Sequence, residues 1–170
     1  MKKYLSILFL IPIIMSCATS TKDLTVVKNF EPEKYLGKWY EIARLDHSFE
    51  RGLDYVTATY SMREDGKIKV LNEGVKSDGT QSQAEGKAYV KKSEDKAGEL
   101  KVSFFLFFYA KYRIIFLDNY EIAVVTSSTK NYLWILARKP QLSEHELRQL
   151  EYFCGQNGFD TEKLIYPKQK

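Results

Sequence analysis

The side chains in this sequence that could do catalytic chemistry are few and badly spaced for it. Asp46, His47 and Ser48 carry the residue types of a nucleophilic triad, but neighbours on an extended chain point to opposite sides and cannot form a relay. His145 lies nearly a hundred residues from His47, and no closely spaced pair of His or Cys of the kind found in zinc sites exists. We therefore expect a protein that is not an enzyme, with no catalytic residue, metal site or cofactor.

Cys17 is the residue with the clearest covalent chemistry. It follows Lys2, Lys3 and an apolar run of twelve residues, Tyr4–Met15. That run is shorter than the about 20 residues that span a bilayer, and its charge and length fit a secretion signal. Residues 14–17 resemble a bacterial lipobox. By that resemblance the signal is cleaved before Cys17, whose sulfur and new amino group then carry lipid chains that anchor the protein stably in a membrane.

The predicted organisation is a signal peptide over residues 1–16, an acylated tether over 17–30 and one domain over 31–170. Removing residues 1–16 leaves 154 of the 170 residues, enough for one sizeable core. Ala18 and Thr19, rather than Asp, follow the cysteine, which resembles the sorting pattern of outer-membrane lipoproteins. The alternative is a plain signal peptide with an incidental cysteine.

The charge balance argues against a nucleic-acid partner. The chain has 26 Lys and Arg against 22 Asp and Glu, and because Lys2 and Lys3 leave with the signal, the mature net charge falls to +2. With Cys17 acylated, Cys154 is the remaining thiol. It lies on the apolar face of a predicted helix, so we expect it to be buried and inert.

From residue 37 onward the chain alternates between short strands and turns. Arg63–Gly66, Ser77–Thr80 and Asp118–Asn119 are typical turn sequences. Eight strands in sequence order predict an all-β fold, an antiparallel up-and-down barrel. The predicted strands cover residues 40–45, 55–62, 67–75, 83–91, 99–109, 112–117, 120–126 and 131–138.

One helix is expected after Pro140. Ser143 and Glu146 have the spacing of a capping box, and Leu147, Leu150 and Cys154 then share one apolar face. Gly155 or Gly158 would end the helix. We expect it to pack on the outside of the barrel, since three acidic residues argue against a membrane-surface helix, whose polar face is rich in Lys and Arg: Glu144, Glu146 and Glu151.

Three motifs together resemble the signatures of the lipocalin family. They are Gly37–Arg44 at the first strand, Asp118–Tyr120 between strands six and seven, and Leu133–Arg138 on strand eight. The stretch Asp46–Gly52 and the lipobox resemble the bacterial outer-membrane lipocalins in particular. The resemblance covers about residues 30–166 and implies a barrel that binds a small lipophilic ligand.

Gly37, Trp39 and Arg138 are predicted to close one end of the barrel. Trp39 supplies a large apolar ring, and Gly37 lets the chain turn tightly into the strand. The guanidinium of Arg138 could lie over the indole, a cation–π contact worth about 0.5–2 kcal/mol. We therefore assign these residues to structure rather than to ligand binding.

The ligand pocket is predicted from the alternation of side chains along each strand, and eight strands leave room for one small ligand. Which side chains of strand eight point inward is ambiguous from alternation, and the resemblance favours Tyr132, Trp134 and Leu136 inside. An apolar, aromatic cavity suits an acyl chain, with Asn72 and Glu41 as polar points, although each side chain could equally be ordinary core. The predicted pocket residues are Val70, Val102, Phe104, Tyr112, Ile114, Phe116, Tyr132 and Trp134.

These expectations predict non-catalytic binding, storage or transport of a fatty acid or lysophospholipid at the periplasmic face of the outer membrane. The alternatives are a barrel enzyme acting on a lipophilic substrate and a carrier of a retinoid or tetrapyrrole. The aromatic run Phe104–Tyr109 is expected to rim the barrel mouth, where it could contact membrane or a second subunit in a homodimer.

Overall fold

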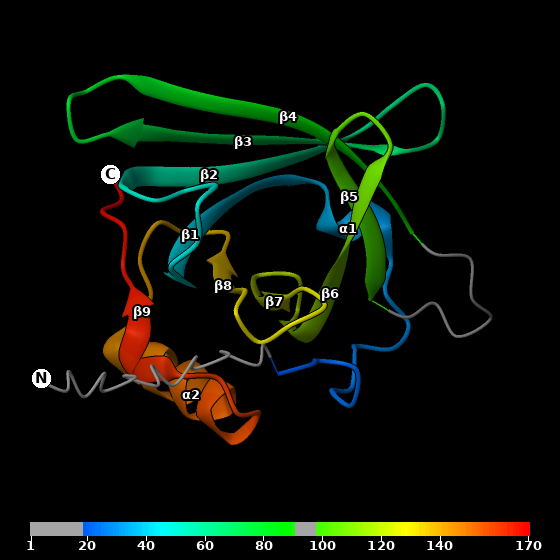
Figure 1. Cartoon of the computed structure of the whole chain (residues 1–170). Coiled ribbons are helices and arrows are strands. Elements are labelled where there is room, and N and C mark those ends of the chain that lie inside the picture. Colours follow the sequence, from blue (N-terminus) through cyan, green and yellow to red (C-terminus); the bar gives the residue numbers. More distant parts are fainter. Residues whose placement is uncertain (1–18, 91–97) are drawn as a thin grey trace, which may run out of the picture.

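One antiparallel sheet closes on itself in the computed structural model, which describes residues 19–90 and 98–170 (Figure 1). Since β1 pairs with both β2 and β8, eight strands in sequence order form a closed barrel, and the short β9 adds beside β1. The predicted eight-stranded up-and-down barrel is confirmed. The strands are β1 (Gly37–Leu45), β2 (Leu53–Met62), β3 (Ile68–Lys76), β4 (Gln81–Val90), β5 (Glu99–Phe105), β6 (Phe108–Asp118), β7 (Ile122–Thr126), β8 (Leu133–Ala137) and β9 (Leu164–Ile165).

One predicted strand is wrong at its end. Residues 99–109 do not form a single strand, because the chain reverses at Leu106, where φ is +46°, and β6 begins at Phe108. A run of aromatic residues without glycine or proline has high strand propensity, which hid this turn in the sequence. At the other connections the expected turn residues do adopt a positive φ, for example +73° at Gly66 and +83° at Gly79.

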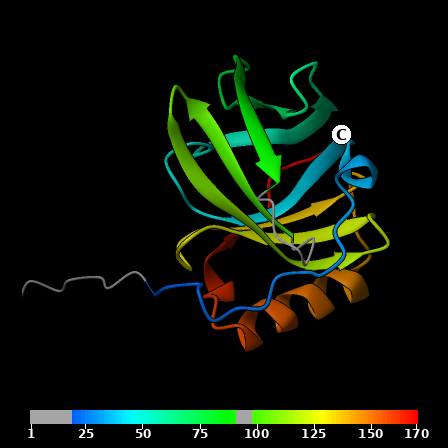
Figure 2. The same ribbon diagram turned by 90° about the vertical axis from the view of Figure 1, so that its right-hand side faces the viewer.

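The helix α2 (Glu144–Gln156) lies against the outside of the barrel, as predicted (Figure 2). Ser143 and Glu146 form the reciprocal capping box. The helix ends at Gln156, and Gly158 follows with a φ of +77°. Within residues 19–90 and 98–170, no helix is long and apolar enough to cross a membrane. The apolar cluster between α2 and the barrel includes Ile42, Leu45, Ile115, Val124, Leu133, Ile135, Leu150 and Cys154.

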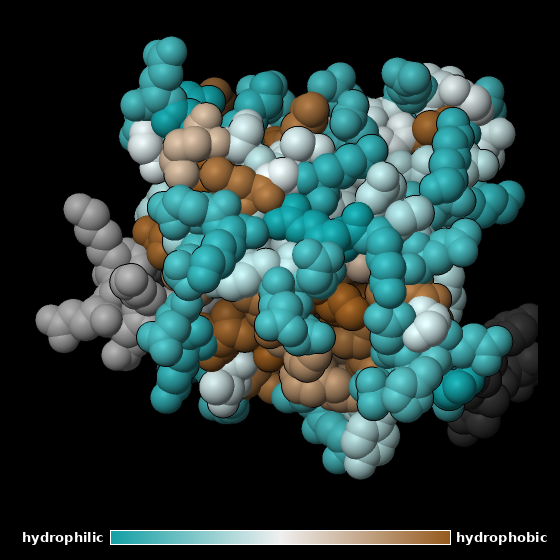
Figure 3. Space-filling model, turned by 180° about the vertical axis from the view of Figure 1, so that it is seen from behind, coloured by the Kyte–Doolittle hydropathy of each residue, from teal (hydrophilic) through white to brown (hydrophobic). Residues whose placement is uncertain are grey.

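A second apolar cluster fills one end of the barrel interior, beside the short helix α1 (Pro32–Tyr35). Seen from behind, the molecule shows a largely hydrophilic surface in which apolar areas are separated by polar side chains (Figure 3). The interior cluster includes Phe30, Trp39, Tyr60, Ile68, Val70, Ala88, Leu100, Ile114, Val125 and Leu136.

The described part of the predicted tether is bound to the barrel. Ser20 forms a β-bridge with Thr129 in the β7–β8 connection, and Arg113 donates hydrogen bonds to the carbonyls of Thr21 and Leu24. The Nε of Arg113 lies 3.3 Å from a carboxylate oxygen of Glu99. These contacts hold residues 19–24 against the barrel.

Candidate functional site

The closed end of the barrel is sealed by Trp39, whose side chain is fully buried. Its Nε1 donates to the carbonyl of Tyr35 at 2.9 Å, and the guanidinium carbon of Arg138 lies 4.0 Å from the centre of its ring. Gly37 has a φ of +97°, and a Cβ there would lie only 3.2 Å from a guanidinium nitrogen of Arg138. The guanidinium also donates to three carbonyls of the entering chain, those of Lys34, Leu36 and Lys38.

Three tyrosines form the floor of the interior above Trp39. The hydroxyl of Tyr112 lies 2.8 Å from that of Tyr35 and 2.8 Å from that of Tyr60. Burial raises the pKa of all three phenols, so they stay neutral and share their protons along the chain of hydroxyls. The floor is therefore aromatic with a polar centre.

An ionic cluster of Glu41, Arg44, His47 and Glu50 lies on the inner wall, between the floor and the mouth. Arg44 donates to the Glu41 carboxylate at 2.6 Å and to the carbonyl of Glu50 at 2.8 Å. His47 Nε2 lies 3.1 Å from a carboxylate oxygen of Glu50. All four residues are buried, with exposed fractions of 1–8 %. They come from β1 and the β1–β2 connection, and the cluster carries both signs of charge.

The two carboxyl groups of the cluster have pKa values shifted in opposite directions. Burial, followed by repulsion from Glu50, raises the pKa of Glu41 well above its usual range despite the contact with Arg44. Burial also tends to raise the pKa of Glu50, but hydrogen bonds from His47 and Trp134 outweigh burial, so the pKa of Glu50 is lowered. Of the two carboxyl groups, Glu41 is therefore the more easily protonated, and Glu50 keeps its negative charge to lower pH.

Aromatic side chains surround Glu50 at the barrel mouth. Trp134 Nε1 donates to the Glu50 carboxylate at 2.9 Å. The ring centres of His47 and Trp134 lie 4.9 Å apart, and Tyr132 stacks at 6.0 Å from Trp134 and 6.2 Å from Phe49. The mouth therefore places apolar rings beside a buried anion.

The inner face of β4 is exposed to solvent above the floor. Ala58, Asn72 and Ala84 form one cross-strand row with the parity of the buried Val70, yet Ala84 is exposed. The Oδ1 of Asn72 is buried and has no hydrogen-bond partner within the described chain, and neither do Arg44 Nε and His47 Nδ1. These inward polar atoms are available to a ligand or to water.

Gly86 makes room for Phe104 in this open region. A Cβ at Gly86 would meet the Phe104 ring at 2.7 Å and the carbonyl of Ser103 at 2.7 Å. The Phe104 ring therefore covers the inner face of β4, although it is 43 % exposed. Only glycine allows this approach.

Most of the predicted pocket residues lie on the inner side of the barrel. Their role in ligand binding stays a prediction. Phe116 is wrongly placed: its ring centre lies 5.3 Å from that of Phe153 on α2, outside the barrel. A β-bulge between Ile114 and Phe116 changes the parity of β6, which alternation alone does not predict. The inward residues are Val70, Val102, Phe104, Tyr112, Ile114, Tyr132 and Trp134.

Five residues of this site were not expected from the sequence: Arg44, Glu50, Tyr35, Tyr60 and Gly86. One signal for the ionic cluster was present, because Glu41 and Arg44 are charged residues within a strand that is otherwise largely apolar. Glu50 carried no such signal, since it reaches the interior only through the fold of the β1–β2 connection.

Residues with catalytic potential are not assembled for a relay. Asp46 pairs with Arg51 on the surface, whereas His47 is buried against Glu50. No group of three or more potential metal ligands occurs in residues 19–90 and 98–170. Burial raises the pKa of the Cys154 thiol to about 12, on the outer side beneath α2.

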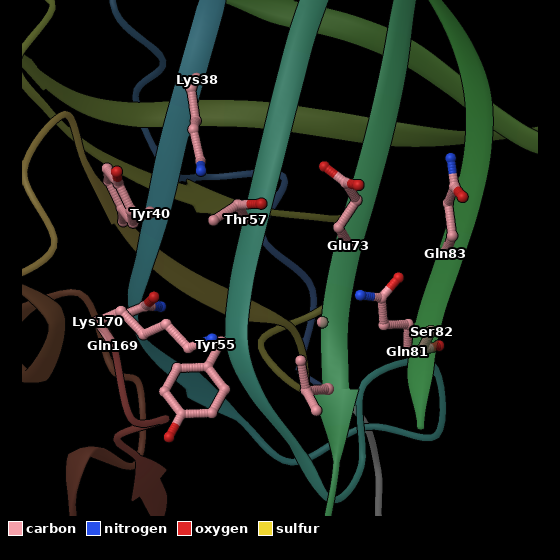
Figure 4. Close-up of a pocket in the computed structure, with 12 residues that line it drawn as sticks. Lys38, Tyr40, Tyr55, Thr57, Glu73, Gln81, Ser82, Gln83, Gln169 and Lys170 are labelled. Atoms are coloured by element: carbon pink, nitrogen blue, oxygen red, sulfur yellow. The ribbon is translucent and has the colours of Figure 1, made fainter. Parts of the chain in front are cut away.

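A separate groove of about 250 Å³ lies on the outer face of β1–β4, where the chain ends (Figure 4). Gln169 donates to the carbonyls of Glu41 and Val56 at 2.7 and 2.9 Å, and so fills the gap where β1 and β2 separate. The groove is lined mainly by polar residues and contains none of the predicted pocket residues.

Comparisons with known proteins agree on one family. The family model described as "Lipocalin-like domain" matches residues 30–169. "Outer membrane lipoprotein Blc" of Citrobacter freundii is 48 % identical over 161 residues, covering 92 % of this chain and 90 % of that protein. The Vibrio cholerae protein of the same name is 46 % identical, covering 93 % and 94 %.

More distant relatives and solved structures also match this chain. "Apolipoprotein D" of Rattus norvegicus is 40 % identical, covering 85 % of this chain and 79 % of that protein. Among solved structures, insecticyanin from the tobacco hornworm Manduca sexta has a TM-score of 0.75 at 19 % identity, covering 90 % of this chain and 88 % of the other. This structural likeness concerns the fold alone.

Proposed function

This chain belongs to the lipocalin family, and on that premise we propose that its barrel binds one fatty acid or lysophospholipid and releases it unchanged. Family membership supports binding or transport of a small hydrophobic ligand. The observation that carries the finer proposal is the division of the interior into an apolar and aromatic region and one buried ionic cluster.

The acyl chain would lie in the open part of the interior, along Val102, Phe104 and Val70. Apolar surface removed from water there contributes about 25 cal/mol per Å². The tyrosine floor limits the depth, because Tyr35, Tyr60 and Tyr112 are already joined by hydrogen bonds above Trp39. An acyl chain longer than this depth would gain no further affinity from its additional CH₂ groups.

The headgroup would lie at the level of the ionic cluster. Arg44 Nε is a buried donor without a partner in the described chain, Glu50 is an anion, and Asn72 Oδ1 is a free acceptor. A headgroup that carries both a phosphate and a cation finds a partner for each charge, whereas a fatty-acid carboxylate uses only the donor. This arrangement favours a lysophospholipid over a fatty acid.

We place the protein at the periplasmic face of the outer membrane, anchored through acylated Cys17. The support is the lipobox resemblance together with the relatives, which are named outer membrane lipoproteins. The role that follows is storage or transport of lipid at that membrane.

One observation favours an enzyme, the inward His47–Glu50 pair. Both groups already have a structural use, since Glu50 accepts from Trp134 and His47 packs against its ring. The Cys154 thiol does not lie beside this pair, because it is buried outside the barrel under α2. We therefore propose binding without conversion.

Native mass spectrometry of the purified protein, followed by organic extraction, tests this proposal. We expect one bound lipid per barrel, recovered with its acyl ester intact. Recovery of a retinoid or tetrapyrrole, or steady conversion of an added lysophospholipid to free fatty acid, would refute it. If conversion is seen, a His47→Gln variant shows whether it depends on the histidine.

A further inference from the structure

Four consecutive apolar residues, Phe105–Phe108, are exposed at the turn between β5 and β6. We call them the aromatic tip. Their side chains are between 61 % and 84 % exposed, and the rings of Phe105 and Phe108 stack with centres 6.4 Å apart. The positive φ of Leu106 forms this turn. A continuous apolar projection of this kind on a soluble domain marks an interaction site.

The residues behind the aromatic tip are arranged in layers. Tyr109 comes next, with its ring centre 5.4 Å from that of Tyr89. Lys101 and Lys111 follow, directly opposite each other on β5 and β6, and Tyr89 on β4 lies in the same cross-strand row. Phenylalanine at the end, tyrosine behind it and lysine behind that is the order that suits the acyl region, the interface and the phosphate layer of a bilayer. A second protein subunit would not require the lysine pair.

The N-terminal segment leads toward the same end of the barrel. Thr19 accepts a hydrogen bond from the backbone N–H of Lys130 in the β7–β8 connection, at 2.8 Å. In Figure 2 the start of the described chain, this connection and the β5–β6 turn all lie toward the left-hand side. The lipid attachment predicted at Cys17 is only two residues before Thr19.

Chain lengths allow the anchor and the tip to reach one plane. Arg113, which holds Thr21, is five residues from Phe108 along β6, or about 17 Å. Cys17 is four residues before Thr21, a reach of up to about 14 Å. An acyl chain attached at Cys17 therefore has the reach to enter a bilayer that the tip also touches.

We propose that the aromatic tip inserts into the bilayer that holds the acyl anchor, so that the barrel mouth faces the membrane. Phe104, next to the tip in sequence, covers Gly86 on the inner wall. The tip is thus continuous with the interior, and a lipid could pass between bilayer and barrel along apolar side chains. The orientation rests on the proposed acylation of Cys17, whereas tip insertion does not depend on which lipid the interior binds.

The test is depth-dependent quenching in vesicles of phosphatidylethanolamine and phosphatidylglycerol with brominated acyl chains. The acylated mature protein, its modification verified by mass, is compared with its Phe107→Trp and Met62→Trp variants. Met62 is exposed at the end of β2 and lines a pocket with Pro32 and Glu33 of α1, at the closed end of the barrel. For Phe107→Trp we expect the emission of the introduced tryptophan to shift to the blue and to be mostly quenched by the brominated chains. For Met62→Trp we expect neither change. Equal quenching of both, or of neither, overturns the proposal.

A second arm separates the membrane from a second copy of the chain. Sedimentation of the mature chain with Cys17→Ser, in the absence of lipid, reports the oligomeric state. We expect a monomer, and we expect Phe107→Asp to reduce flotation with vesicles several-fold without changing the circular dichroism spectrum. A dimer that Phe107→Asp dissociates would show that another subunit covers the tip, and the proposal would fail. Lipid extraction from the same samples reports separately on the proposed ligand.

Discussion

The guanidinium of Arg138 stacks 4.0 Å above the ring of Trp39 while donating to three carbonyls of the chain that enters β1. The residues are 99 positions apart in the sequence. Their contact ties the first and last strands of the barrel together at its closed end.

The first prediction concerns this contact. Trp39→Ala removes a fully buried ring and should lower the free energy of unfolding by about 3–5 kcal/mol. Arg138→Ala should cost less, and the two losses should not add in the double mutant, because the side chains touch. Urea denaturation of the four proteins of the cycle measures this. Strict additivity would contradict the stacking.

The second prediction concerns pH. The pKa of Glu41 is raised in the folded state, so the native protein binds more protons than the unfolded chain above about pH 4.3, the ordinary value of Glu. Its contribution to stability is therefore present below that value and is lost as pH rises through the folded pKa. Glu41→Gln should remove this slope and raise stability at neutral pH. Denaturation across a pH series measures it, with the exposed Glu64→Gln as control, and an unchanged slope would count against a protonated Glu41.

The third prediction concerns the acyl site. Affinity should rise with chain length by about 0.8 kcal/mol per buried CH₂ and then level off. Trp134 emission should respond to binding, and Trp134→Phe should remove the response. Val102→Asn should weaken every ligand, since it places an unpaired polar group on an apolar wall, whereas Lys101→Ala on the outer face should not. Fluorescence titration over a fatty-acid and lysophospholipid series decides this, and affinity independent of chain length would exclude an acyl site.

The fourth prediction concerns Gly86. Gly86→Ala should force Phe104 or the β5 backbone to move, because the added Cβ would meet both at 2.7 Å. We expect lower stability together with weaker lipid binding. Gly155→Ala is the matched control, since nothing lies within 4 Å of its Cβ position in α2, and there alanine should stabilise by up to about 1 kcal/mol. Equal effects of the two substitutions would argue against the close approach at Gly86.

The fifth prediction concerns the anchor. Cys17→Ser should abolish acylation and leave the precursor uncleaved by the lipoprotein peptidase, since the lipobox resemblance makes the cysteine the modified residue. Incorporation of radiolabelled palmitate measures this. Label that persists in the variant would show that Cys17 is not the site.

The closure by Trp39 and Arg138 was expected from the resemblance to the lipocalin signatures, since no local signal joins residues 99 positions apart. The order of strands and the capping of α2 were accessible from the sequence alone. Each depends on local signals: alternation with period two, turn residues, and Ser143 three positions before Glu146. Such signals act between near neighbours in the sequence, so they can be recognised without knowledge of the fold.

Other features were decided by tertiary structure. A bulge in β6 turned Phe116 outward, and the chain reversed at Leu106 without a glycine. The ionic cluster depends on the fold of the β1–β2 connection, which brings His47 and Glu50 into contact with each other and Glu50 into contact with Arg44. A shift of one residue exchanges the two faces of a strand, and the fold of a loop is set by distant contacts. Neither leaves a periodic pattern in the sequence, so only the closed barrel could determine which polar groups face the interior.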